Sequence, residues 1–147
     1  MSIKLQVKWT EKMKLQAQAA ENQITMDAHP PFGQGSAMTP KELVVAGLCG
    51  CTGMDVLALL KKHKQNFTSF NIEANVPTGE GHPVVFSSAE LVFKIEGEVD
   101  PLVAVESVKL SQTKYCGVSA MLSKSFPITY KVLVNDTEVG SGEASFE

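Results

Sequence analysis

The stretch that decides the fold is TPKELVVAGLCGCTGMDVLALL, residues 39–60. Thr39, followed at once by proline and three residues later by Glu42, is typical of a helix N-terminus. A largely apolar run follows, and the cationic segment 61–64 suits a helix C-terminus. The sequence therefore predicts one helix over 39–64, about 39 Å long at about 1.5 Å per residue.

This helix is apolar on nearly all sides, which predicts a buried helix. The apolar run 43–60 is long enough for a membrane span, but Asp55, three glycines and flanking strand patterns favour the core of a globular domain. Gly47, Gly50 and Gly53 each cost about 1 kcal/mol relative to alanine. We infer a close approach of another backbone, the same helix of a second subunit. The alternatives are a kink or bulky residues of the chain's own sheet.

Alternating apolar and polar residues predict strands on both sides of the helix. The predicted strands are 3–9, 13–19, 24–26, 70–76, about 84–98 and 128–134. A second helix is expected to open at Asp100 and a short one to follow Cys116. This order predicts a single α+β domain over 1–147 with antiparallel sheets. The pattern leaves open whether residues after Val134 form a strand.

The composition narrows the function classes. The 147 residues carry a net charge of −3 and no strong basic face, which disfavours nucleic-acid binding. Three cysteines without a signal-peptide pattern predict a reducing cytoplasm. All 13 basic residues are lysines, so no bidentate arginine can bind a carboxylate or phosphate.

The three cysteines differ in setting. Cys49 and Cys51 point about 200° apart on a helix, so they cannot share one site. Cys116 lies at a break between predicted helices, where the first-turn amides are expected to lower its pKa. A zinc site of Cys51, Cys116 and His63 is disfavoured, because His63 lies about 18 Å from Cys51 along the helix axis. Asp55 is expected to be a structural acid with a hydrogen-bond partner.

Residues 39–60 together with LSQTKYCGVSAMLSK, residues 110–124, resemble the OsmC/Ohr family of thiol-dependent hydroperoxide reductases. GCTGMDV with KYCGVSA looks most like its YhfA-type branch. The resemblance covers nearly the whole chain. It implies antiparallel sheets wrapped around a long buried central helix in an intertwined homodimer, with the active site at the subunit interface.

The resemblance also implies roles for individual residues. Cys51 matches the cysteine that peroxide attacks, Cys116 its resolving partner, and Glu42 a glutamate that works with an arginine near the thiol. Cys49 matches neither cysteine and is expected to fill the core. The expected reaction is antioxidant: an organic hydroperoxide oxidises Cys51 to a sulfenic acid, Cys116 forms a disulfide with it, and an external dithiol restores both thiols without a bound cofactor.

The chain departs from this pattern because it has no arginine. Lys41 or His29 could supply the missing charge, and Glu42 could serve only as the capping residue of its helix. The alternative function is therefore an OsmC-like dimer that binds an apolar small molecule or senses redox state without efficient turnover.

Overall fold

The computed structural model describes residues 1–147, which form two compact units, Met1–Ala46 and Gly47–Glu147. The division falls within helix α1 (Pro40–Lys62). The presence of this helix confirms the long helix that the sequence predicts from its capping residues. By length and composition, α1 is apolar enough to cross a membrane, and 28% of its most apolar window is buried.

The first unit contains a three-stranded antiparallel sheet. Its strands, in spatial order, are β1 (Gln6–Glu11), β2 (Lys14–Ala19) and β3 (Asn22–Met26). Every residue of β1 is exposed, including Val7 and Trp9 on its apolar face. The sheet of this unit thus exposes apolar side chains.

The loop after β3 is organised by a single acid. Asp27 is 3% exposed and accepts hydrogen bonds from the backbone N–H groups of Ala28, Gln34 and Ser36 and from the Ser36 hydroxyl. These bonds, the Ser36 hydroxyl first, lower the pKa of Asp27 to about 2. Gly33 closes the turn, because a Cβ there would collide with the Ala28 carbonyl.

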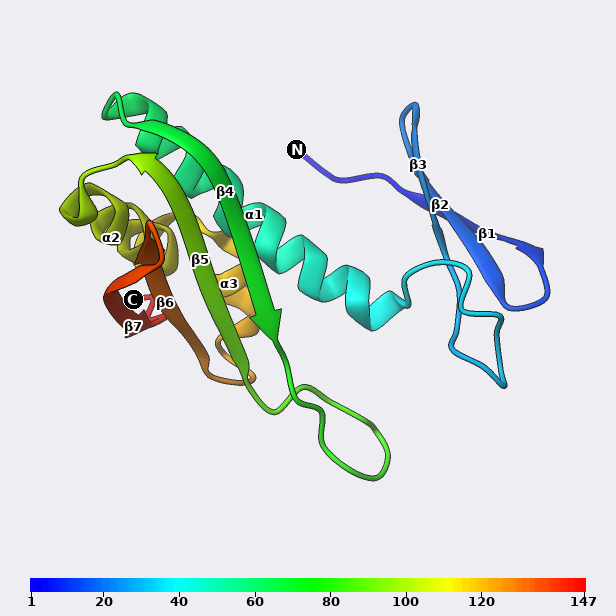
Figure 1. The fold of residues 1–147 in the computed structure, drawn as a ribbon. Helices are drawn as coiled ribbons and strands as arrows, with labels where there is room; N and C mark the ends of the chain where they lie inside the picture. The colour runs from blue at the N-terminus through cyan, green and yellow to red at the C-terminus, as the bar shows by residue number, and fades with distance from the viewer. The chain divides into compact units, whose positions relative to one another are not determined.

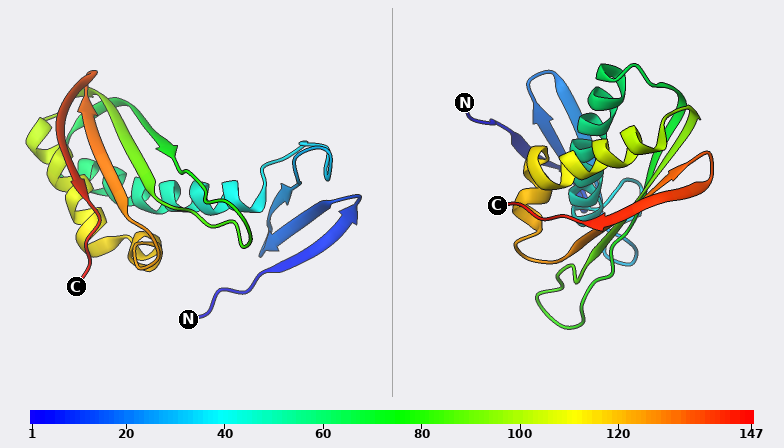
Figure 2. Two further views of the ribbon diagram at one scale, coloured as in Figure 1. Left: turned by 90° about the horizontal axis from the view of Figure 1, so that it is seen from below. Right: turned by 90° about the vertical axis from the view of Figure 1, so that its left-hand side faces the viewer.

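The second unit combines a four-stranded sheet with helices on one face (Figures 1 and 2). Its elements after α1 are β4 (Asn66–Asn75), β5 (Ala89–Glu98), α2 (Pro101–Leu110), the π-helix η1 (Ser111–Tyr115), α3 (Gly117–Leu122), β6 (Ile128–Val134) and β7 (Thr137–Glu143). The strand order is β4-β5-β6-β7. The residues after Val134 therefore do form a strand.

One strand pair departs from the antiparallel expectation. β5 and β6 run parallel, with Phe93 opposite Val132, whereas the other pairs are antiparallel. A parallel pair needs a long crossover, and α2, η1 and α3 provide it. Cys116 lies in this crossover, between η1 and α3.

The core of this unit lies between the sheet and the helices. From α1 it takes Leu48, Val56 and Leu60, each at most 1% exposed, and from the sheet it takes alternate residues such as Phe93 and Val132. Burial at period two along the strands places them against the helical layer. Only one side of α1 is used in this way, and Met54 on another side is 74% exposed.

Candidate active site

Two of the three cysteines meet in the second unit. Cys51 lies on α1 and is partly exposed, while Cys116, the N-cap of α3, is 1% exposed. The Cys51 thiol lies near enough to Cys116 to raise the pKa of the Cys116 thiol. The fold therefore brings together two thiols that are 65 positions apart in the sequence.

The protonation of Cys116 is controlled mainly by burial, which raises the pKa of its thiol, and the neighbouring Cys51 raises it further. The Ser119 hydroxyl and backbone N–H act in the opposite direction, and that N–H donates to Sγ at 3.3 Å. A helix amide does lower the pKa of Cys116, as expected, but loss of hydration outweighs it, so the pKa is raised overall. Ser119 Oγ itself is buried without another partner.

Cys49 occupies a different environment from Cys51. Its side chain packs against the hydrophobic core, and burial raises the pKa of its thiol. A difference of two helical positions is enough for this separation, because the two side chains leave α1 in nearly opposite directions. Cys49 thus fills the core, as the sequence predicts.

A rare π-helix leads into Cys116. The backbone N–H of Cys116 donates to the carbonyl of Ser111 at 2.9 Å, five residues back. Single π-helical turns are frequent at functional sites. Here the turn determines where Cys116 leaves the helix.

A chain of buried hydrogen bonds joins this turn to α1. Thr52 Oγ1 lies 2.7 Å from Ser111 Oγ, which lies 2.9 Å from Asp55 Oδ2. Gln112 Nε2 donates to Thr52 Oγ1 at 2.7 Å. Asp55 is therefore a structural acid with a partner, as expected.

Thr52, Ser111 and Gln112 were not among the sequence-predicted site residues. Their only sequence signal was polarity inside two apolar helical segments, with Thr52 and Asp55 three positions apart. Such spacing places two side chains on one helix face without identifying their partner.

Glu42 lies in the first unit and completes a capping box. Its carboxylate accepts from the Thr39 N–H at 2.9 Å, and its own N–H donates to Thr39 Oγ1 at 3.2 Å. These bonds to Thr39 and the charge of His29, whose Nε2 is 3.8 Å away, lower the pKa of Glu42. Of the two cations considered from sequence, His29 rather than Lys41 is paired with Glu42.

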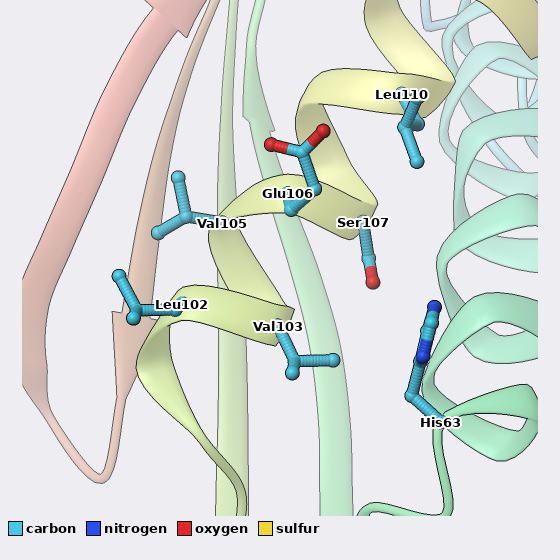
Figure 3. Close-up of a pocket in the computed structure, with 7 residues that line it drawn as sticks. All are labelled: His63, Leu102, Val103, Val105, Glu106, Ser107 and Leu110. Atoms are coloured by element: carbon cyan, nitrogen blue, oxygen red, sulfur yellow. The ribbon is translucent and has the colours of Figure 1, made fainter.

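A separate cavity of about 440 Å³ lies between the end of α1 and helix α2 (Figure 3). Its lining is mostly apolar and consists of His63, Leu102, Val103, Val105, Glu106, Ser107 and Leu110. Neither Cys51 nor Cys116 lines it. It ends at Leu110, the residue before the π-helix.

Comparison with known proteins identifies the family. A family model described as OsmC-like protein matches residues 33–131, which include Cys51 and Cys116. The chain belongs to the OsmC-like family. Protein YhfA of Escherichia coli K12 is 30% identical to this OsmC-like chain over 126 residues, covering 84% of the chain and 92% of YhfA.

Solved structures share the OsmC-like fold. A hypothetical protein from Aquifex aeolicus VF5 matches with a TM-score of 0.82 and 23% identity, over 100% of this chain and 98% of that one. An OsmC-like protein from Mycoplasma pneumoniae matches with a TM-score of 0.80 and 14% identity, over 91% and 97%. An organic hydroperoxide resistance protein from Legionella pneumophila matches with a TM-score of 0.65 and 15% identity, over 91% and 96%.

Proposed function

We propose that this protein is a cysteine-based peroxidase that reduces organic hydroperoxides through Cys51 and Cys116. The single observation that carries the proposal is the position of these two thiols, side by side, with Cys51 partly exposed and Cys116 buried. An outside oxidant reaches Cys51 before the buried Cys116, and Cys116 is then the neighbouring thiol that attacks the sulfenic acid formed there.

The reaction has three balanced steps. The Cys51 thiolate attacks one peroxide oxygen, and the O–O bond breaks to give an alcohol and a sulfenic acid. Cys116 attacks the Cys51 sulfur, which forms the disulfide and releases water. An external dithiol then reduces the disulfide in two exchanges and leaves as its own disulfide.

The raised pKa of Cys116 supports its role as the resolving cysteine. A thiol that remains protonated is a poor nucleophile toward peroxide. Glu42 is the third proposed catalytic residue, and the His29 ring, whose Nε2 lies 3.8 Å from its carboxylate, takes the place of the arginine that this chain lacks.

We further propose that the protein works as a homodimer in a reducing cytoplasm. Gly47 and Gly50 have no atom within 4 Å of the position of a Cβ, and the apolar face of β1 is exposed. A second copy would cover both surfaces, and burial of such apolar area stabilises association.

The second candidate function is binding of an apolar small molecule without efficient turnover. The mostly apolar cavity beside α2 favours it, because ligand sites are usually apolar with a few polar groups. The absence of arginine in the sequence points in the same direction.

The deciding experiment is intact-mass analysis with peptide mapping after one equivalent of cumene hydroperoxide. We expect rapid loss of two hydrogens that maps to Cys51–Cys116, and a trapped sulfenic acid at Cys51 in Cys116→Ser. Cys49→Ser is the matched control and should react like the wild type. Thiols that react no faster than free cysteine would exclude the peroxidase and leave the binding function.

A further inference from the structure

We propose that Ser111 is a positioning residue for the disulfide: its carbonyl holds the backbone of Cys116, and its hydroxyl ties that backbone to the turn of α1 that carries Cys51. The inference rests on the cysteine pair of the proposed function. It adds Ser111 as the residue that determines how closely the sulfur atoms of Cys51 and Cys116 can approach each other.

The direction of the hydrogen bonds follows from the chemistry of the groups. The Ser111 hydroxyl donates its one proton to Oδ2 of Asp55. The Thr52 hydroxyl is then the donor to Ser111 Oγ. Gln112 Nε2 donates to Thr52 in turn, so every hydroxyl proton in the chain is used once.

Burial makes this chain rigid. Thr52, Ser111 and Gln112 are each 0% exposed, so water cannot replace a lost partner. A buried polar group left unpaired costs about 1–3 kcal/mol. Gln112 Nε2 also donates to Ser111 Oγ at 3.4 Å, whereas Gln112 Oε1 has no hydrogen-bond partner. Alternative positions of the Ser111 turn are therefore disfavoured.

The hydrogen bond from the Cys116 N–H to the Ser111 carbonyl is also stabilised by a residue outside the helix. In an α-helix, the Cys116 N–H would donate to the carbonyl of Gln112, four residues back. That carbonyl instead accepts from the backbone N–H of Ser145 at 3.0 Å. Cys116 therefore bonds to Ser111, and the π-helical register is stabilised by a residue beyond β7.

The consequence concerns the disulfide-forming step. Condensation of the Cys51 sulfenic acid with the Cys116 thiol requires the two sulfur atoms to approach closely, and misplacement by about 1 Å can cost about 10²-fold in rate. Thr52 is the residue next to Cys51, and Ser111 bonds directly to Cys116. The chain therefore links the backbones of the two cysteines through Thr52 and Ser111.

The test measures the equilibrium constant for oxidation of the Cys51–Cys116 pair by oxidised glutathione, which needs no peroxide. The variants are Ser111→Ala and Thr52→Val, with Thr52→Ser as the conservative rescue. Ser123→Ala is the matched control, because Ser123 is a partly buried serine whose hydroxyl bonds to the Ala120 carbonyl and has no part in the chain. Thermal melts of both redox forms verify folding.

We expect the constant to fall by about tenfold or more in Ser111→Ala and Thr52→Val, because removing one link lets the thiols separate. Thr52→Ser and Ser123→Ala should stay within about twofold of the wild type. Equal constants in Ser111→Ala and Ser123→Ala would overturn the inference, since a merely structural serine destabilises both redox forms alike. A wild type that forms the disulfide but ignores peroxide would remove the proposed peroxidase and leave this inference standing.

Discussion

A Cβ atom on Gly53 would lie 3.1 Å from Cδ1 of Ile72, so α1 packs closely on β4 at this position. Gly50, one turn earlier, has nothing within 4 Å of such an atom. The glycines thus divide: Gly53 accommodates the chain's own sheet, one of the alternatives considered from sequence, while Gly50 and Gly47 remain open for the predicted second subunit.

This contrast predicts the effect of filling Gly50. In an isolated chain, Gly50→Ala should raise the free energy of unfolding by up to about 1 kcal/mol, because alanine is the better helix former. If a second helix packs there, Gly50→Leu should instead weaken the dimer, as measured by sedimentation equilibrium. Ser125→Leu, at an exposed turn, is the control of equal bulk. A Gly50→Leu protein that dimerises as tightly as the wild type would place the interface elsewhere.

Titration of a protein with Cys116 as its only thiol tests whether burial raises the pKa of that thiol. Absorbance of the thiolate in Cys49→Ser/Cys51→Ser should give a pKa above the ordinary thiol value of 9.0, because burial is the largest cause of the shift and remains. Ser119→Ala in this background should raise the pKa further, since the Ser119 hydroxyl lowers it. A midpoint below 9.0 would restore the expectation that helix amides dominate.

Three variants separate the two roles of Glu42. Glu42→Gln keeps an oxygen for the Thr39 N–H but removes the charge, because glutamine also serves in capping boxes. We expect it to melt like the wild type and to react with cumene hydroperoxide more slowly. Thr39→Ala keeps the carboxylate and should lose about 1 kcal/mol of stability. Equal peroxide rates in Glu42→Gln and the wild type would leave Glu42 with its capping role only.

Asp27 predicts a pH dependence of stability. Its pKa is about 2 in the folded chain against an ordinary value of 3.8, so its ionised form stabilises the fold above about pH 4. That contribution is lost as pH falls from about 4 to about 2. Asp27→Asn should therefore melt below the wild type at pH 7, and the gap should narrow toward pH 2. Glu21→Gln, at an exposed turn, is the control. A gap independent of pH would contradict this origin.

The long helix could be predicted from sequence because its signals are local. The Thr39–Glu42 capping box is present as expected, and the cationic end matches the termination at Lys62. The pairing of Cys51 with Cys116 came from a family resemblance, since no local pattern brings together residues so far apart.

The parts that sequence did not predict depend on distant partners. The π-helical register needs Ser145, and the buried hydrogen bonds of Ser111 need α1. The direction of the Cys116 pKa shift depends on burial, which only the packed chain defines. The parallel β5–β6 pair follows from the path of the crossover.

The π-helix gives the protein a specific genetic vulnerability. A π-turn holds one residue more than the α-turn it replaces. Loss of a single codon within 112–115 would convert the segment to an ordinary α-helix. The residues that follow directly would then be turned by about 100° about the axis of this helix. Cys116 would then leave the helix in another direction, although both cysteines would still be encoded. In this chain, reading-frame-preserving deletions could therefore separate the thiols without changing either one.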